Sequence, residues 1–361
     1  TIVGAGPAGL ACAIILARAG RKVIVREWHK TVGSRFHGDY QGLENWSGKR
    51  DVLEELNEAG IETSFNAHPV CDGTAYDYRG EAYPITGDRT LYYLVQRGGQ
   101  EGSLEQGLLE QAVSVGVDIR FGERATSIKG PAVSAIGPRS ADAIAAGYIF
   151  ETGEADSNHI AFDNRLAPHG YAYLLIHNGR GTLASCMFSG FKNQAMHVAR
   201  SVKFFEDKTG LKMNSPRPFG GFGNFRIPNT AMQGGHPLIG EQAGFQDMLA
   251  GFGMRYALRS GILAAQSLIE GSDYIRLWRA QLLPLLKTGI SNRFLYNAAG
   301  DRGARLALQD ISRSNAYQPS LLTKIIFPLA RRQFRHPLHD PSCDHIACQC
   351  VWCEHGVGHV I

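Results

Sequence analysis

The sequence predicts an α/β protein in which a Rossmann-like unit is interleaved with an antiparallel β-sheet and is followed by a helical C-terminal part. Three observations support this prediction: a glycine-rich strand, turn, helix and strand at the start, a second glycine-rich turn that leads into an apolar helix, and a series of short β-rich runs between them. A chain of 361 residues also indicates two or more domains.

Composition and charge exclude several other classes. Charged residues make up 19% and there are 43 glycines, which is typical of a globular protein with many tight turns. The net charge of +4, without a basic block, gives no reason to expect nucleic acid as a partner. The chain has no run of about 18 apolar residues and no visible export signal, so we expect a cytoplasmic protein. Seven cysteines, an odd number, fit intracellular thiols or a metal site better than a disulfide framework.

The opening stretch TIVGAGPAGLACAIILARAGRKVIVRE contains the pattern G-x-G-x-x-G. In such a unit Gly4 permits the tight turn, Gly6 lets the backbone approach a pyrophosphate, and Gly9 lets helix and strand pack closely. Glu27 ends the second strand, where an acid accepts hydrogen bonds from the adenosine ribose hydroxyls. The unit predicts dinucleotide binding without separating NAD from FAD. Its predicted cofactor-binding residues are Gly4, Gly6, Pro7, Ala8, Gly9 and Glu27.

The second glycine-rich stretch, GEQAGFQDMLAGFG, leads into an apolar helix from Met254. It resembles the FAD-binding signature GD-A-G…G-G of flavoproteins in the p-hydroxybenzoate hydroxylase (GR2) fold group, most closely of the geranylgeranyl reductase family. The resemblance implies FAD, with Glu241 at the ribityl chain and the helix N-terminus at the pyrimidine edge of the flavin. The family usually has Asp at Glu241 and Pro at Met248. The residues implicated are Gly240, Glu241, Gly251, Phe252, Gly253 and Met254.

A third segment, LVQRGGQEGSLEQGLLEQAVSVGVDIRF, combines an arginine with a helical apolar stripe and a strand. The family resemblance implies that Arg97 contacts the cofactor near its phosphates, whereas a surface arginine at a helix start is the alternative. We also place Arg35 among the cofactor-binding residues.

Four short runs, GYIFET, HIAFDN, GYAYLLIH and GTLASCMFSG, predict the strands of a mainly antiparallel sheet. The stretch PHGYAYLLIHNGRGTLASCMF resembles the geranylgeranyl reductase pattern P-x-G-Y-A-W-x-F-P, with Tyr173 at the usual tryptophan and Ile176 at the usual proline. The resemblance implies that Tyr171 and Tyr173 line a substrate cavity; the alternative is that both pack a sheet face.

A histidine follows the second strand, in VGSRFHGDYQGLENW. The related family tends to have Cys-Gly near the flavin where this chain has His37 and Gly38. An imidazole titrates near neutral pH and can donate or relay a proton to the carbon opposite a transferred hydride. The alternative is an ordinary loop histidine. The candidate catalytic residues are therefore His37, Tyr171 and Tyr173.

The C-terminal part carries two unusual stretches. SLLTKIIFPLARRQFRH mixes apolar and basic residues and can either lean on an anionic membrane surface or pack against the rest of the protein. The tail CDHIACQCVWCEHGVGH is dense in thiols and imidazoles, which predicts zinc, an iron–sulfur cluster or redox-active thiols. The candidate metal ligands are Cys343, Cys348, Cys350, Cys353, His345 and His355.

These segments predict a discontinuous domain organisation. The FAD-binding domain takes 1–65, 92–135 and 222–270, the β-sheet substrate domain 66–91 and 136–221, the helical C-terminal region 271–335, and the Cys/His-rich tail 336–361.

The resemblance implies an FAD-dependent reductase of carbon–carbon double bonds in an isoprenoid or other apolar substrate. The scattered tryptophans cannot form the W-x-W-x-I-P motif of flavin-dependent halogenases, and the only Asp-Gly pair, Asp72-Gly73, is misplaced for the aromatic hydroxylase element. No second dinucleotide fold is visible, so we expect an external electron donor: a ferredoxin, a quinol or NAD(P)H. Two alternatives stay open: a quinone- or ferredoxin-linked electron-transfer flavoprotein, and a non-redox flavoenzyme similar to lycopene cyclase.

Overall fold

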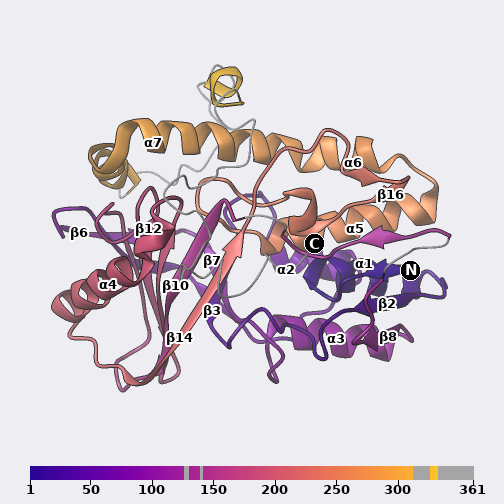
Figure 1. Cartoon of the computed structure of the whole chain (residues 1–361), viewed down its shortest axis with the longest axis horizontal. Coiled ribbons are helices and arrows are strands. Elements are labelled where there is room, and N and C mark those ends of the chain that lie inside the picture. The colour runs from indigo at the N-terminus through magenta and orange to yellow at the C-terminus, as the bar shows by residue number, and fades with distance from the viewer. Residues whose placement is uncertain (126–129, 139–140, 312–325, 332–361) are drawn as a thin grey trace.

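A computed structural model describes residues 1–125, 130–138, 141–311 and 326–331 of the chain. The described chain has two parts that lie side by side (Figure 1). One part, with the N-terminus, is built on a parallel sheet and is called the nucleotide part; the other is built on a seven-stranded sheet. The long helix α7 (Leu283–Ile311) runs along one side of both.

The nucleotide part has a four-stranded parallel sheet in the order β8-β2-β1-β9. Helix α1 (Pro7–Arg18) connects β1 to β2, and Pro7 suits the first turn because that position needs no intrahelical N–H bond. Helix α1 is buried on nearly every face, between α3 and α5. The bounds are β1 Ile2–Val3, β2 Ile24–Glu27, β8 Asp118–Phe121, β9 Val133–Ser134, α3 Leu104–Ser114 and α5 Met254–Glu270.

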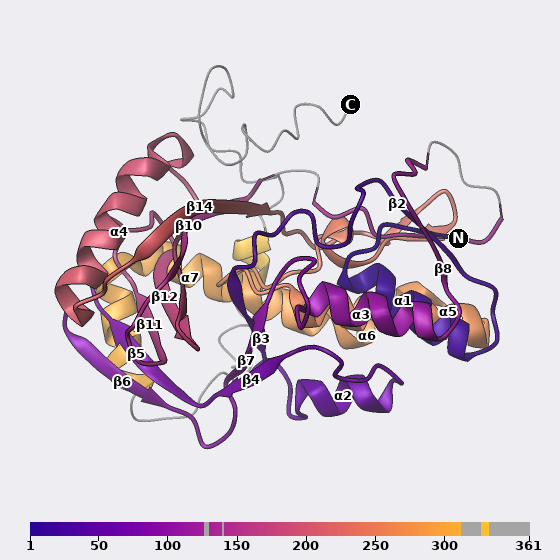
Figure 2. The same ribbon diagram turned by 90° about the horizontal axis from the view of Figure 1, so that it is seen from below.

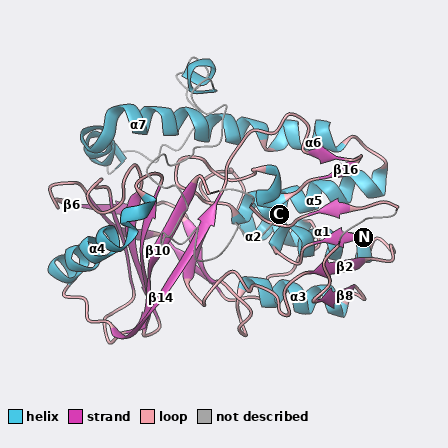
Figure 3. Ribbon diagram, viewed as in Figure 1, coloured by secondary structure: helices cyan, strands magenta, loops and turns pink. Residues whose placement is uncertain are grey.

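The larger sheet has the order β14-β10-β13-β12-β11-β5-β6, and every neighbouring pair is antiparallel except β11 and β5. The four predicted strand runs form β10 to β13, so this part of the prediction is confirmed (Figure 3). The strands are β5 Asp72–Tyr76, β6 Ala82–Thr86, β10 Ala143–Glu151, β11 Ser157–Ala161, β12 Tyr171–His177, β13 Arg180–Met187 and β14 Asn214–Gly223.

Alternate side chains of β12 point to the two opposite faces of this sheet, which pack against different parts of the molecule. Helix α4 (Gln194–Thr209) covers one face, where Leu174 and Ile176 pack with Phe205. Side chains at alternate positions of a strand point to opposite faces. Tyr171 and Tyr173 therefore point away from α4, toward the interior between the two parts of the molecule.

A three-stranded antiparallel sheet, β3-β7-β4, lies between the two parts (Figure 2). It consists of β3 Tyr40–Glu44, β7 Tyr92–Gln96 and β4 Ala67–Val70, and helix α2 (Val52–Glu58) follows β3. Asp51 caps α2 by accepting a hydrogen bond from the Leu53 N–H.

The apolar run PLIG, which precedes the second glycine turn, forms only a short strand. Only β16 (His236–Pro237) pairs there, with β15 (Met232–Gln233), and Leu238 forms a single bridge to Ser134. The chain then enters a 3-10 turn at Gly240, whose φ of 61° takes it out of the extended conformation.

The C-terminal part is helical. Helices α5 and α6 (Tyr274–Gln281) lead into α7, which bends at Gly300, where φ is 57°. Among the residues that the structure describes, no helix is long and apolar enough to cross a membrane. The predicted fold class, with its interleaved sheets and helical C-terminal part, is confirmed.

Candidate cofactor and substrate site

A large cavity of about 1980 Å³ lies between the two parts of the molecule. Its walls come from the glycine loops, from β5, β6, β11 and β12, and from α7. Ligand pockets typically measure about 300–1,000 Å³, so this cavity has room for a cofactor and a second molecule. We call its two ends the glycine end, around Gly4–Ala8 and Gly240–Gly253, and the sheet end, around β11, β12 and α7.

The predicted site residues converge on this cavity. All of the candidate cofactor-binding and catalytic residues except Gly9 line it: Gly4, Gly6, Pro7, Ala8, Glu27, Arg35, His37, Arg97, Tyr171, Tyr173, Gly240, Glu241, Gly251, Phe252, Gly253 and Met254. Their individual roles stay predictions, but the structure places them around one space.

The three glycines of the first loop meet different surroundings. A Cβ at Gly4, where φ is 104°, would lie 2.3 Å from the Ala135 carbonyl oxygen, and one at Gly9 would lie 2.1 Å from the Gly4 carbonyl oxygen. A Cβ at Gly6 would have nothing within 4 Å, and Gly6 lines the large cavity. Gly4 and Gly9 therefore hold the loop together, while Gly6 leaves bare backbone toward the cavity beside the N-terminus of α1. This cradle fits the pyrophosphate of FAD.

Glu27 braces the first glycine loop. One carboxylate oxygen accepts the Ala5 N–H and the other accepts the His29 N–H, both at 2.8 Å. Trp28 follows directly and is 49% exposed, with the Arg124 guanidinium 5.3 Å from its ring centroid. Both side chains line the large cavity. Trp28 was not among the predicted site residues, although its position directly after Glu27, the acid predicted to bind the ribose, was a usable signal.

The two glycine segments are joined to each other. Arg35 Nη1 lies 3.0 Å from Glu241 Oε2, and Arg35 Nη2 donates to the Phe222 carbonyl at 2.9 Å. Helix α5 also packs closely on α1, because a Cβ at Gly261 would lie 2.2 Å from the Ala8 carbonyl oxygen. The N-termini of α1 and α5 both border the cavity, where their free N–H groups can meet phosphate or a negatively charging flavin edge.

Asp247 shapes the turn that carries Gly251 to Gly253. Its carboxylate accepts the N–H groups of Leu249 at 3.2 Å and Ala250 at 2.8 Å, and its own N–H donates to the Phe252 carbonyl at 2.8 Å. Burial raises the pKa of Asp247 above its ordinary value. Hydrogen bonds of the Asp247 side chain and backbone therefore hold the turn in this shape without a bound cofactor.

Arg97 lines the cavity, and its guanidinium forms an ion pair with Glu105. Its guanidinium donates to Glu105 Oε1, 2.5 Å from Nη2, and to Gln41 Oε1 at 2.6 Å. It also lies 3.7 Å from the centroid of the Phe36 ring. A buried pair of this kind positions the loop, and the predicted contact with the cofactor phosphates would use a guanidinium that Glu105 already holds.

At the sheet end, Tyr171 and Tyr173 lie with their ring centroids 6.2 Å apart. The Tyr171 hydroxyl donates to the Ala250 carbonyl at 2.5 Å, which links β12 to the second glycine turn. Burial raises the pKa of both phenols well above their ordinary value, so both stay neutral and cannot act as bases near neutral pH. His37 lines the same cavity, with its ring 6.4 Å from that of Phe219.

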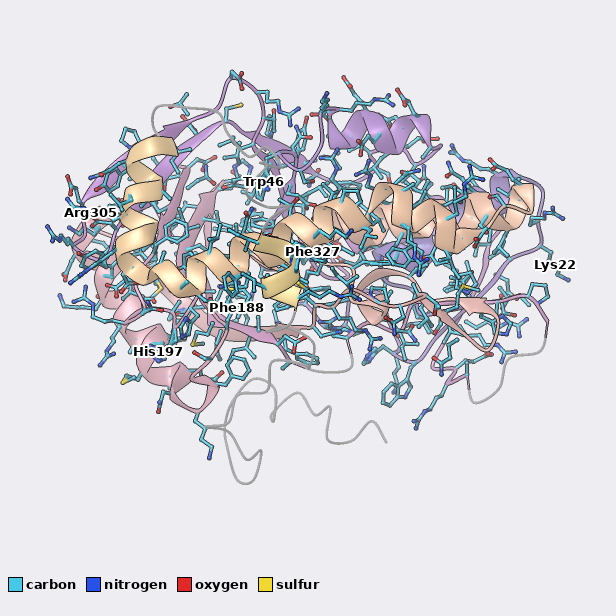
Figure 4. The ribbon with its side chains drawn as sticks, turned by 90° about the horizontal axis from the view of Figure 1, so that it is seen from above. Lys22, Trp46, Phe188, His197, Arg305 and Phe327 are labelled. Carbon is cyan, nitrogen blue, oxygen red and sulfur yellow. The ribbon has the colours of Figure 1, made fainter. Side chains whose placement is uncertain are left out.

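Arg293 of α7 is a buried residue of the cavity wall that was not among the predicted site residues. It is 2% exposed, donates to the carbonyl oxygens of Met248, Leu249 and His169, and lies 3.5 Å from the Phe188 ring centroid. Phe188 lies beside α7 in Figure 4. Burial lowers the pKa of Arg293 to about 10, so the group stays charged. No sequence motif marks it, because its partners are backbone atoms from two distant loops.

The predicted metal ligands Cys343, His345, Cys348, Cys350, Cys353 and His355 lie outside the described residues, as does most of the apolar and basic stretch before them. Within the described ranges, no group of three or more His, Cys, Asp or Glu side chains is placed to hold a metal ion.

Comparisons with known proteins agree with this geometry. Residues 1–135 match the FAD binding domain family. No curated protein matches the sequence. Three solved structures are similar over most of their length. A geranylgeranyl bacteriochlorophyll reductase-like protein from Thermoplasma acidophilum is 18% identical, with a TM-score of 0.69, over 92% of this chain and 97% of that chain.

The flavin-dependent brominase Bmp2 is 15% identical, with a TM-score of 0.64, over 92% of this chain and 98% of that chain. PqsL, a probable FAD-dependent monooxygenase from Pseudomonas aeruginosa, is 16% identical, with a TM-score of 0.64, over 86% of this chain and 98% of that chain. Identities this low show the fold alone. The fold is that of flavoproteins of the p-hydroxybenzoate hydroxylase group, and the N-terminal match supports FAD as the cofactor. The neighbours carry different chemistries, so the fold does not choose among them.

Proposed function

We propose that the protein is an FAD-dependent reductase of carbon–carbon double bonds in an isoprenoid or other apolar substrate. The observation that carries this proposal is one continuous cavity with a bare-backbone glycine end and an apolar sheet end. Apolar side chains from β6, β11, β12 and α7, and Phe162 directly after β11, line the sheet end; the others are Ile85, Ile160, Leu175 and Leu308. A hydrocarbon chain fits such a wall, and a dry site protects a hydride from water.

Each end of the cavity has a separate task in this proposal. Bound FAD supplies a hydride from its reduced ring. The backbone at Gly6 and the helix N-termini bind the phosphates and the electron-rich flavin edge. The neutral phenols of Tyr171 and Tyr173 orient the substrate without taking a proton from it. His37, which lines the same cavity, hands a proton to the substrate.

The electron donor in this proposal is external: a ferredoxin, a quinol or NAD(P)H. Because the substrate is apolar, we expect the protein to act in the cytoplasm at the surface of a membrane. The apolar and basic stretch before the tail is the candidate segment for contact with that membrane. The cysteine-rich tail is the candidate site for zinc or an iron–sulfur cluster. An iron–sulfur cluster there would favour the alternative of an electron-transfer flavoprotein, because it gives electrons an entry point.

Absorption spectroscopy tests the proposal first. The purified protein should show flavin bands that bleach on anaerobic reduction, and these bands should return when a polyprenol such as geranylgeraniol is added to the reduced protein. Reoxidation only by a protein or quinone would favour electron transfer, and product without net reoxidation would favour a lycopene-cyclase-like reaction. Protein that binds no FAD even after reconstitution would end the proposal. A His37→Ala protein with unchanged turnover would remove His37 from it.

A further inference from the structure

A second, small cavity of about 40 Å³ adjoins the large one. Trp46 and Ser47 line both cavities, so they form the wall between them. Trp46 lies near the middle of the molecule in Figure 4. Its ring packs edge-on against Phe252 of the second glycine turn, with centroids 4.6 Å apart. The small cavity therefore lies behind the turn that we assign to the flavin.

The walls of the small cavity hold polar atoms that the described residues do not satisfy. Among the described residues, the carboxyl oxygens of Glu44, which is 1% exposed, meet only the backbone N–H groups of Glu44 and Arg255, outside regular hydrogen-bond geometry. The buried Ser47 Oγ has no hydrogen-bond partner among these residues. Arg255 Nη1, close by, is in the same condition. A buried polar atom without a partner costs about 1–3 kcal/mol. One water needs about 10–15 Å³, so a few waters fit here and would satisfy these atoms.

Glu44 is held neutral by its surroundings. Burial raises its pKa to about 8; the positive charge of Arg255 and nearby backbone N–H groups oppose this shift, and the Asp247 carboxyl adds to it. Arg255 is paired with Glu55 at 2.8 Å, and Arg259 lies 3.5 Å from the same carboxylate, so both cations share their charge between Glu55 and the nearby Glu44.

Tyr256 is the other titratable group on the wall of the small cavity. Leu285, Thr288 and Gly289 complete the wall and carry no charge. Among the described residues, the carboxyls that face this space are Glu44 and Asp247. Asp247 accepts two backbone N–H groups in regular hydrogen bonds, whereas neither oxygen of Glu44 has a regular hydrogen bond, so Glu44 can accept a hydrogen bond from water.

We propose that Glu44 is a proton store for the reaction, which releases its proton through the small cavity and past Ser47 into the large cavity. The inference rests on the proposed function, since a double-bond reduction needs one proton for each hydride. His37 lies in the large cavity itself, whereas Glu44 keeps its proton outside it until the reaction requires it. Glu44 therefore acts through Ser47 and water and does not touch the substrate.

The step balances in atoms and electrons. When FAD is bound, its reduced ring would supply a hydride, with two electrons, to one alkene carbon. The other carbon takes the proton that His37 hands to it, and Glu44 replaces this proton through Ser47 and water. The O–H bond of Glu44 breaks and leaves its electron pair on the carboxylate, which the nearby charge of Arg255 favours. Solvent returns a proton to Glu44. FAD would regain the equivalent of one hydride from the external donor: directly from NAD(P)H, as two electrons and one proton from a quinol, or as two electrons from two ferredoxins with a proton from solvent.

The first readout concerns Glu44 itself and does not depend on turnover. Infrared difference spectra of the FAD-loaded protein compare the wild type with Glu44→Gln, Ser47→Ala and Glu54→Gln, an exposed glutamate of α2 that serves as the control. We expect a neutral carboxylic acid band in the wild type that disappears as the pH rises through about 8. Only Glu44→Gln should lack it. A spectrum with ionised Glu44 at pH 7 would overturn the inference.

The second readout is the rate at which geranylgeraniol reoxidises the dithionite-reduced, FAD-loaded protein without oxygen. Loss of a general acid typically costs about 10²–10⁴-fold, so Glu44→Gln should slow this step by at least about 10²-fold. Ser47→Ala should slow it while keeping the carboxylic acid band. Reoxidation by oxygen should stay at the wild-type rate in both variants, which shows that the cofactor is bound normally.

The rate of reoxidation of the wild type by geranylgeraniol should also fall above pH 8, because the neutral acid is then lost. This decrease with pH should be absent in Glu44→Gln. A Glu44→Gln protein with the wild-type rate and the same decrease above pH 8 would overturn the inference, while the proposed reductase function would stand. A wild-type protein that shows the infrared band but is not reoxidised by the polyprenol would overturn the proposed function, and the proton role with it.

Discussion

The two ends of the large cavity are built in opposite ways. At the glycine end, the absence of side chains makes the site: Gly6 exposes backbone, while Gly4 and Gly9 let main-chain atoms come closer than any Cβ allows. At the sheet end, large side chains from β12 and α7, including Tyr171, Arg293 and Tyr296, make the wall. A site made of backbone depends on a short local pattern, whereas a site made of side chains depends on distant segments meeting.

The difference also separates stability from binding. The side chains of the sheet end are bonded to loop carbonyls: Tyr171 to Ala250, Tyr296 to Gly170 at 2.7 Å, and Arg293 to three more. Changes there should lower the stability of the whole chain. At the glycine end, Gly6 has free space around it, so a change there should affect the cofactor and spare the fold.

The largest effect is expected from Arg293→Met, which removes a buried guanidinium that bonds three carbonyl oxygens. We expect the free energy of unfolding to fall by about 3 kcal/mol, because each oxygen loses a charged donor. Chemical denaturation measures the loss. Arg302→Met, an exposed position on the same helix, is the matched control and should change stability by less than about 0.5 kcal/mol. Equal stabilities for the two variants would mean that Arg293 does not hold the loops together.

A pair of alanine substitutions tests the glycine end. Gly9→Ala should destabilise the protein by about 1–3 kcal/mol, because its Cβ would lie 2.1 Å from the Gly4 carbonyl oxygen. Gly6→Ala should leave the stability of the FAD-free protein within about 0.5 kcal/mol of the wild type. It should still weaken FAD binding by about tenfold, since the methyl group occupies the cofactor's approach to the backbone.

Fluorescence titration of FAD, beside denaturation of the same two proteins, provides the measurement. If Gly6→Ala binds FAD as tightly as the wild type, the bare backbone is not a phosphate cradle, and the distinction between the two ends disappears.

The same contrast explains what the sequence could predict. The glycine loops, the helices after them and the strand runs follow from local spacing and alternation, so the fold class was accessible from the chain alone. Tyr171 and Tyr173 were found through a resemblance to a short pattern. The cavity they line was not visible in the sequence, because its far wall comes from α7.

Arg293 and Glu44 show where local reasoning stops. Arg293 is an ordinary arginine in a helical segment until three loop carbonyls surround it. Glu44 closes a strand as many exposed glutamates do, and only the packing of α5 and α7 around it removes it from water. Burial and partner geometry are properties of the folded chain. Trp28 is different, since its place directly after Glu27 is a local signal.

The smallest effect sharpens the comparison most, because it changes one oxygen atom at the place where the two ends meet. Tyr171→Phe removes the hydroxyl that donates to Ala250, which should lower the free energy of unfolding by about 1 kcal/mol. Tyr173→Phe is the control, since among the described residues its hydroxyl makes no hydrogen bond to that turn. Because Ala250 directly precedes Gly251, Tyr171→Phe should also loosen the second glycine turn and weaken FAD binding, whereas Tyr173→Phe should not. If neither phenylalanine variant changes FAD affinity, the sheet end does not support the glycine end, and the two act as separate sites that share a cavity.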